Sequence, residues 1–326
     1  MSIRTLQFRP SAVIRISEEN TITEITAEEV NALKSTIVLA QLSPLPDTEG
    51  NIKKAEAAVR EVCSGQHADM IVFPESYMVR IPGHSDIKKK NDFAQRLDGS
   101  FVQAMRKLAK QYGIWMVFGM LEQPERSRLL QEEQEKPSRV FNTTVLLDSS
   151  GEIVSVYRKT HLYDAFGVRE SDRFLAGDSL FTPVDTPFGK IAVFICYELR
   201  FPEIARRMAL EGAQIILAPA AWYQGSSKKE QFQMLARTRA LENTVFLLAC
   251  NQCGGGTTGG SLAADPMGRI IADAGEEEQL LTVSVDTGQI AEVRRGLPCL
   301  EQRHPELYGA VFGDGTEKYS EKPGEI

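Results

Sequence analysis

The chain has 326 residues, of which 42% are hydrophobic and 25% charged, a composition typical of a soluble globular protein. Its formal net charge of −7, with no basic block, makes nucleic acid and anionic membrane surfaces poor candidate partners. No apolar run approaches the roughly 18 residues that cross a bilayer, and residues 1–34 lack the apolar centre of a signal peptide. The five cysteines are few and odd in number, which argues against a disulfide framework, so we expect a cytoplasmic protein.

Residues 1–34 are expected to form an N-terminal extension, with a short helix starting at the capping-box pattern Thr26-Ala-Glu-Glu29. Beyond it, apolar runs predict strands and amphipathic stretches predict helices. The strands are predicted at 36–42, 70–73, 114–119, 140–147, 152–157, 191–195, 214–217, 245–249, 261–264, 269–272 and 280–285, and the helices at 51–63, 93–112, 202–210 and 230–243. Turn residues at 148–151 and 265–268 predict two hairpins, and 124–139 reads as a surface loop.

The alternation of strands and helices, mixed with hairpins, predicts an α/β layered sandwich. We find no internal repeat and no linker that would divide the chain. The expected organisation is therefore a single domain at 35–287, with the extension 1–34 before it. A loop-rich tail at 288–326 follows and is a candidate for oligomer contacts.

Three polar side chains are expected at the ends of predicted buried strands. Glu75 follows the run 70–73, Lys159 follows 152–157, and Cys196 follows 191–195. Each has an ordinary interpretation, because charged residues at strand ends are usually solvated and unpaired cysteines are often small core residues. Together they have the parts for acyl transfer: a carboxylate to accept the thiol proton, and an ammonium to stabilise the thiolate and a developing oxyanion. We therefore expect an enzyme with a Glu-Lys-Cys triad.

Five motifs strengthen this expectation: Phe73-Pro-Glu75, Tyr157-Arg-Lys159-Thr-His-Leu162, Cys196-Tyr-Glu-Leu-Arg-Phe-Pro-Glu203, Arg239-Ala-Leu-Glu-Asn243 and Asp265-Pro-Met-Gly268. In this order, the set resembles the nitrilase superfamily of carbon–nitrogen hydrolases, over residues 36–285. The resemblance implies a four-layer α-β-β-α sandwich, a homodimer or higher homo-oligomer paired across the helix that follows the nucleophile, and no metal or organic cofactor.

The resemblance also assigns roles to individual residues. It implies that Cys196 is the nucleophile and Glu75 the general base. Lys159 would bind the tetrahedral intermediate, assisted by the backbone N–H of Tyr197. Glu170, in Arg169-Glu-Ser171, matches a second glutamate that many members have and would position Lys159 or the substrate amide.

The residues after the nucleophile resemble an amidase branch that acts on ω-amides of α-keto acids and on deaminated glutathione. That branch commonly has aspartate where this chain has Glu198. Arg200 would bind a substrate carboxylate or, alternatively, form a structural ion pair with Glu198 or Glu203. Ala221 and Trp222 match the position of the pocket wall in the family, although Trp222 also fits a packing role. The implied function is hydrolysis of a small, carboxylate-bearing linear amide through a cysteine thioester, with release of ammonia.

Several alternatives stay open. N-carbamoyl hydrolysis needs the same catalytic set, whereas nitrile hydrolysis is less favoured because Tyr197, not tryptophan, follows Cys196. A non-enzymatic binding scaffold is disfavoured because all four positions with an expected chemical role keep a residue that can perform it. His161 invites a Cys–His dyad, but the resemblance implies a structural histidine. The CxxC spacing of Cys250 and Cys253 has no second pair, so we interpret these as core and loop thiols.

Overall fold

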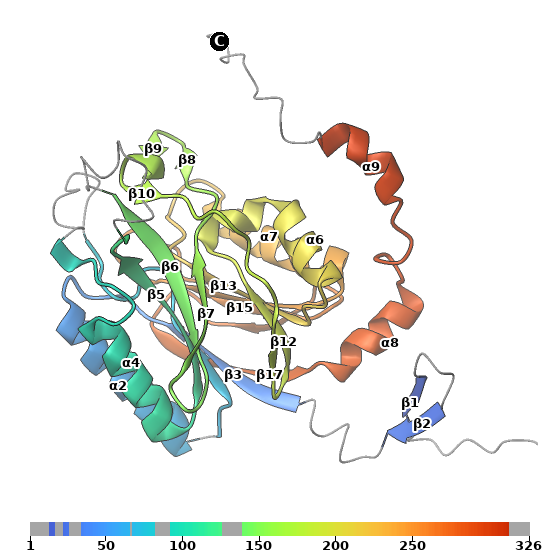
Figure 1. Cartoon of the computed structure of the whole chain (residues 1–326), viewed down its shortest axis with the longest axis horizontal. Coiled ribbons are helices and arrows are strands. Elements are labelled where there is room, and N and C mark those ends of the chain that lie inside the picture. Colours follow the sequence, from blue (N-terminus) through green and yellow to red (C-terminus); the bar gives the residue numbers. More distant parts are fainter. Residues whose placement is uncertain are drawn as a thin grey trace, which may run out of the picture.

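The computed structural model describes residues 13–16, 22–25, 34–65, 67–81, 92–125 and 139–312, and two large β-sheets form its body (Figure 1). The first sheet has the strand order β10-β6-β5-β4-β3-β17, with β7 also paired to β6. Its strands are β3 (Lys34–Gln41), β4 (Met70–Val72), β5 (Trp115–Glu122), β6 (Val140–Leu147), β7 (Ile153–Arg158), β10 (Phe174–Leu175) and β17 (Gln279–Asp286). Because β6 is antiparallel to β5 and β7 is antiparallel to β6, β7 runs in the direction of β4 and β5. The carboxyl ends of β4 and β7 therefore lie at the same edge.

The second sheet has the order β11-β12-β13-β14-β15-β16, with a parallel centre of β12, β13 and β14. Its strands are β11 (Val184–Thr186), β12 (Gly189–Val193), β13 (Ile215–Ala220), β14 (Phe246–Asn251), β15 (Leu262–Ala264) and β16 (Ile270–Asp273). Every residue of β13 and β14 is buried, as expected for parallel strands covered on both faces. The carboxyl ends of β12, β13 and β14 thus share one edge as well.

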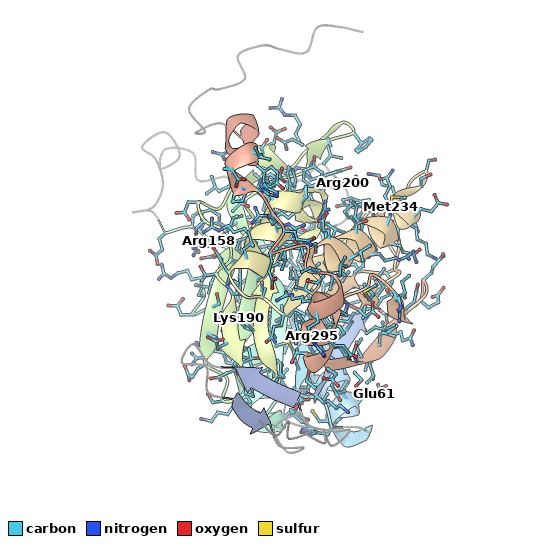
Figure 2. The ribbon with its side chains drawn as sticks, turned by 90° about the vertical axis from the view of Figure 1, so that its right-hand side faces the viewer. Glu61, Arg158, Lys190, Arg200, Met234 and Arg295 are labelled. Carbon is cyan, nitrogen blue, oxygen red and sulfur yellow. The ribbon has the colours of Figure 1, made fainter. Side chains whose placement is uncertain are left out.

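Helices cover the outer face of each sheet (Figure 1). They are α2 (Thr48–Gly65) and α4 (Ser100–Tyr112) on the first sheet, and α6 (Pro202–Leu210) and α7 (Lys228–Asn243) on the second. Pro202 stands at the first turn of α6, where no intrahelical N–H partner is needed. Gly113 ends α4 in the left-handed conformation, with φ of 63°. On α7, Met234 points outward and is 64% exposed (Figure 2).

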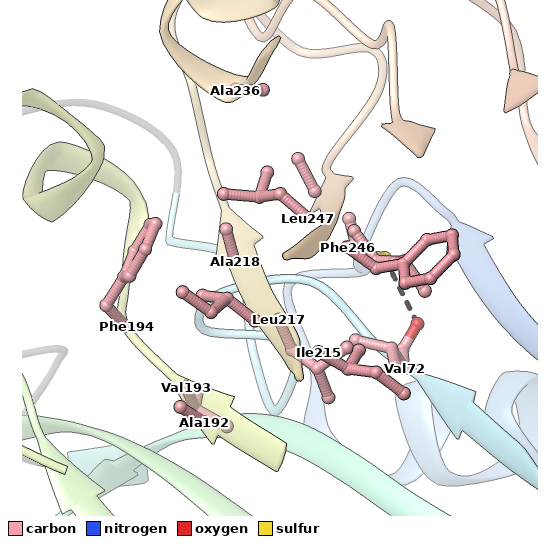
Figure 3. Packing of buried hydrophobic residues seen from close by; sticks show 14 of the residues in the cluster. Val72, Ala192, Val193, Phe194, Ile215, Leu217, Ala218, Ala236, Phe246 and Leu247 are labelled. Carbon is pink, nitrogen blue, oxygen red and sulfur yellow. Dashed lines mark hydrogen bonds between the residues drawn. The ribbon is translucent and has the colours of Figure 1, made fainter. Parts of the chain in front are cut away.

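The core explains why the sheets stack. Side chains alternate along a strand, so on β3 Val38 packs with α2 and α4 while Ile37 packs with the second sheet. Figure 3 shows the same contact for β4, where Val72 lies close to Ile215 and Leu217 of β13. The order of layers is helices, sheet, sheet, helices. The expectation of an α/β sandwich is confirmed.

Some boundaries differ from those predicted. Two helices, α8 (Gly288–Gly296) and α9 (Pro305–Phe312), lie in the tail that was predicted to be loop-rich. The helix predicted at 93–112 begins only at Ser100, after Gly99. Lys34 already belongs to β3, and the short helix predicted before it falls at 26–33, outside the described residues. So does most of the predicted loop 124–139.

Two short antiparallel strand pairs complete the description. The N-terminal extension contains an antiparallel pair, β1 (Val13–Ile16) and β2 (Ile22–Ile25). A small hairpin, β8 (Asp164–Ala165) and β9 (Val168–Arg169), follows Lys159. Within the described ranges, no helix has both the length and the apolarity to cross a membrane.

Candidate active site

Side chains from both sheets meet where the strands end. Glu75 follows β4, Lys159 follows β7, and Cys196 follows β12 at the start of the 3₁₀ helix η3 (Cys196–Arg200). Together with Glu170, from the 3₁₀ helix η2 (Glu170–Asp172), they line a cavity of about 540 Å³. The fold therefore brings together an acid, an ammonium, a thiol and a second acid that are far apart in the sequence.

Glu75 is 5% exposed, and both of its carboxylate oxygens are hydrogen-bonded. Oε1 accepts from Lys159 Nζ at 3.0 Å and from Asn142 Nδ2 at 2.7 Å. Oε2 accepts from the backbone N–H of Ala221 at 2.7 Å, and the neighbouring Cys196 thiol helps to lower the pKa of this carboxylate. Burial raises the pKa of Glu75, but Lys159 and the hydrogen bonds outweigh burial and hold the net pKa below its usual value.

Lys159 is buried between two carboxylates. Its Nζ lies 3.0 Å from Glu75 Oε1 and 3.0 Å from Glu170 Oε2, and the side chain is 2% exposed. Burial would lower the pKa of Lys159, but Glu170, Glu75 and Cys196 raise it well above its usual value. Glu170 Oε2 also accepts from the backbone N–H of Tyr163 at 2.6 Å, which fixes the carboxylate. Lys159 is thus a permanently charged donor held in one place.

Cys196 is a thiol in the resting site. Burial raises the pKa of Cys196 well above its usual value and Glu75 raises it further, whereas Lys159 lowers it. Together with the lowered pKa of Glu75, this places the proton on sulfur and the charge on the carboxylate. A thiol and a carboxylate in these states are a donor and an acceptor between which a proton can be transferred.

Strained backbone is concentrated in the loops around the cavity. Five non-glycine residues in the described ranges have positive φ, and four of them lie beside or within the lining. They are Ser76 (51°), Phe166 (54°), Cys196 (49°) and Ser227 (56°). Such conformations persist only where the surroundings enforce them, and they are typical of functional sites. The loop that follows Glu75 also requires a glycine at position 119 on β5, because a Cβ there would lie 2.3 Å from the backbone nitrogen of Ser76.

Glu198 joins the segment of Cys196 to the loop that follows Lys159. Its carboxylate is fully buried and accepts five hydrogen bonds: from the Tyr157 hydroxyl (2.7 Å), the Thr160 N–H (2.9 Å) and hydroxyl (2.7 Å), the His161 N–H (3.2 Å) and the Ile195 N–H (2.7 Å). Burial raises the pKa of Glu198, but these bonds and the His161 side chain hold it below its usual value. One carboxylate thus fixes Cys196 relative to Lys159.

The predicted binding residues also lie at the cavity. Tyr197, Arg200, Ala221 and Trp222 all line it. Ala221 contributes its N–H to Glu75, while Trp222 packs on Phe232 with ring centres 5.3 Å apart. The alternative ion pairs for Arg200 are wrong: it binds neither Glu198 nor Glu203, because its guanidinium donates to Gln231 at 2.8 Å instead.

The lining contains more positive than negative charge. Among the described residues that line the cavity, the cations are Arg80, Lys159, Arg173, Arg200 and Lys228, and the carboxylates are Glu75 and Glu170. In the same part of the chain, no ion pair joins Arg80, Arg173, Arg200 or Lys228 to a carboxylate. The cavity is thus positive in a protein whose formal net charge is −7.

Several site residues were missed from the sequence. Asn142 could have been found as a polar residue inside an apolar run, and its amide also reaches Glu170 Oε1 at 3.4 Å. Gln252 follows β14 and holds the backbone carbonyl of Glu75 at 2.7 Å, so it is another strand-end signal. Arg80, Arg173 and Lys228 gave no signal, because surface and cavity cations look alike in a sequence.

The minor motifs have structural roles. His161 packs against Phe201, with ring centres 4.2 Å apart and the rings tilted by 39°, and its Nδ1 lies 3.6 Å from Glu198. Cys250 donates to the carbonyl of Val72 at 3.1 Å inside the core. Within the described ranges, no cluster of histidine, cysteine and acidic side chains is arranged to hold a metal ion.

Comparison with known proteins gives a consistent set of relatives. Residues 36–295 match the sequence profile named carbon-nitrogen hydrolase. The human deaminated glutathione amidase is 31% identical over 285 residues, which cover 84% of this chain and 83% of that protein. The omega-amidase NIT3 of Saccharomyces cerevisiae is 27% identical, covering 88% and 99% of the two chains. The crystal structure of Saccharomyces cerevisiae Nit3, from branch 10 of the nitrilase superfamily, superposes with a TM-score of 0.72 at 26% identity, covering 83% and 97%.

Proposed function

Because the chain belongs to the carbon–nitrogen hydrolase family, we propose that it is an amidase that hydrolyses a small, carboxylate-bearing linear amide and releases ammonia. The observation that carries the proposal is that the Cys196 thiol lines the same cavity as the buried carboxylate of Glu75, which is itself held by Lys159 at 3.0 Å. Relatives named as amidases support the reaction class. The positive lining of the cavity supports an anionic substrate.

The proposed reaction has two halves. Glu75 accepts the proton of Cys196 as the sulfur attacks the amide carbon, and Lys159 stabilises the resulting oxyanion together with the Tyr197 N–H. Protonated Glu75 then gives its proton to the leaving nitrogen, so that ammonia departs and a thioester remains. In the second half, Glu75 accepts a proton from water as the water oxygen attacks the thioester carbon. The C–S bond then breaks, the carboxylic acid is released, and Glu75 returns the proton to the sulfur of Cys196. Glu170 keeps the Lys159 ammonium in position throughout.

An ammonia-release assay tests the proposal. The panel consists of linear amides with and without a terminal carboxylate, N-carbamoyl acids and nitriles. We expect amides to be hydrolysed and Cys196→Ala to abolish release, while Cys63→Ser, which removes a half-buried thiol on α2, leaves it unchanged. A trapped acyl adduct on Cys196, detected by mass spectrometry, would establish the thioester. Turnover retained by Cys196→Ala would refute the mechanism.

We also propose that two copies pair through the face of α6 and α7. Apolar side chains are exposed there, namely Leu210 (48%), Met234 (64%) and Leu241 (42%). Light scattering of the full chain should give a dimer or larger species, and Met234→Asp should shift it toward the monomer. The cytoplasmic location and the division into 1–34, 35–287 and 288–326 stay predictions.

A further inference from the structure

A second group of polar side chains in the cavity has no part in the proposed bond breaking. It consists of Arg200, Lys228 and Tyr163, next to the indole ring of Trp222. The guanidinium carbon of Arg200 lies 4.8 Å from the centre of that ring, and Lys228 Nζ lies 5.9 Å from it. Lys228 Nζ also donates to the Tyr163 hydroxyl at 3.4 Å. Two cations therefore lie near one aromatic ring of the lining, and one of them contacts a hydroxyl.

Neither cation is neutralised within the described part of the chain. Arg200 donates to the uncharged amide of Gln231, and its Nε is buried without a hydrogen-bond partner. Lys228 Nζ lies over aromatic faces, 4.0 Å from the ring centre of Phe166 and 5.6 Å from that of Tyr163. Partial burial lowers the pKa of Lys228, and the neighbouring Arg200 lowers it further. Half-buried like charges without a counter-charge are unfavourable, which indicates that an anion completes the group.

The backbone holds Lys228 in this place. Its carbonyl accepts from Trp222 Nε1 at 2.9 Å, and its N–H donates to the Gly225 carbonyl at 3.2 Å. Ser227, which precedes it, has a φ of 56°, a conformation that a serine rarely adopts. The first residue of α7 is thereby fixed beside Trp222, in contact with the ring at the tip of the β8–β9 hairpin.

We propose that Arg200, Lys228 and the Tyr163 hydroxyl bind the carboxylate of the substrate, and that Lys228 determines the preference for anionic over neutral amides. The inference rests on the proposed amidase function and names the specificity of that same site. A planar guanidinium provides paired donors that fit a carboxylate, and the ammonium adds a third charged donor from another element. The Tyr163 hydroxyl, which accepts from Lys228, can donate its own proton to the same anion.

Succinamate and butyramide form the matched substrate pair, because they differ in a terminal carboxylate against a methyl group. We expect wild type to prefer succinamate, and Lys228→Met to lower kcat/KM for succinamate by about 10-fold or more while butyramide changes by less than about twofold. Lys228→Arg should keep most of the preference. The control Lys229→Met removes the next lysine, which pairs with Glu276 at the surface, and should leave both substrates unchanged.

A binding measurement separates this proposal from the catalytic one. In the Cys196→Ala background, calorimetric titration should show tighter binding of succinamate than of butyramide, and adding Lys228→Met should weaken succinamate alone by about 10-fold. Equal affinities for the two amides, or an equal loss of both in Lys228→Met, would overturn the carboxylate subsite whether or not turnover is observed. Turnover by Cys196→Ala would refute the thioester mechanism and leave the binding comparison intact.

Discussion

Replacing Lys159 with methionine would leave two buried carboxylates without the ammonium between them. The Lys159 nitrogen lies 3.0 Å from an oxygen of Glu75 and 3.0 Å from an oxygen of Glu170. Methionine has nearly the same length, so the packing is kept while the charge is lost. Breaking a buried ion pair by removing one partner costs about 3–5 kcal/mol of folding free energy. We expect a loss of this size near neutral pH, together with nearly complete loss of turnover.

The pH dependence of this loss identifies its cause. In wild type, burial raises the pKa of Glu75 but Lys159 outweighs it, so the folded pKa lies below the unfolded value of about 4.3. The stabilisation is present above that value and is lost as the pH falls through the folded pKa. Without the ammonium, one of the two carboxylates keeps a proton, its folded pKa is raised, and stability falls as the pH rises. The slope is at most about 1.4 kcal/mol per pH unit.

Urea unfolding of the full-length protein at pH 5 and pH 8 measures this effect. The gap between wild type and Lys159→Met should be wider at pH 8, by about 2 kcal/mol or more. The control Lys190→Met removes a more exposed lysine, labelled in Figure 2, that lies 3.6 Å from Asp185 and should cost less than about 1 kcal/mol at either pH. A gap that does not change with pH, or one below about 1 kcal/mol at pH 8, would refute this electrostatic account.

Three further outcomes are expected. Glu198→Gln should lower the free energy of unfolding by about 2–4 kcal/mol, because both oxygens accept hydrogen bonds, one of them from the Ile195 N–H, and an amide must set its own N–H groups against one of these donors. Gly119→Ala should reduce kcat by about tenfold or more and cost about 1–3 kcal/mol in urea unfolding, because its Cβ would push against the Ser76 backbone that follows Glu75. The pH profile of kcat/KM should have an acid limb below the usual glutamate range, where Glu75 becomes protonated, and stay flat to about pH 9.

The two substitutions each have a control variant. Glu211→Gln removes a surface carboxylate paired with Arg207 and should change the unfolding free energy by less than about 1 kcal/mol. Gly65→Ala adds a Cβ in open space at the end of α2 and should leave activity unchanged. An acid limb near pH 6.5 would instead indicate a histidine base and contradict the assignment of Glu75. If Glu198→Gln and Gly119→Ala were as stable as wild type, Glu198 and Gly119 would not constrain the site.

The convergence of the three strand-end residues in the candidate site could be predicted because strand ends are visible in a sequence. Apolar runs of strand length end abruptly before Glu75, Lys159 and Cys196, and the parallel directions of β4, β7 and β12 within their sheets make such ends converge. Burial then removes these side chains from water, which the sequence alone indicates only through the apolar runs. The resemblance to a known family supplied what the pattern left open, namely Glu170 and the roles of the four residues.

The proposed carboxylate-binding residues were harder to predict, because their role depends on the direction in which each side chain points and not on the composition of the segment. Lys228 stands in the polar run Ser226-Ser-Lys-Lys-Glu230, which is typical of a solvated helix start. The left-handed Ser227 and the bond from Trp222 help to place Lys228 at the lining, while Lys229 pairs at the surface. The helices of the tail were missed for a related reason. α8 buries only Ile290, so its apolar pattern is weak.

The division of charge within the cavity connects the chemistry with the substrate. Lys159, Glu75 and Glu170 together carry one net negative charge, since the pKa of Lys159 is raised and that of Glu75 is lowered. A carboxylate-bearing amide would be repelled by this group at short range, because Coulomb energies are large where water is excluded. The cations Arg200 and Lys228 offset that repulsion without touching the reacting atoms. In the proposed mechanism, the lysine that stabilises the oxyanion can therefore remain bound to two carboxylates, while selection of an anionic substrate depends on other cations in the same cavity.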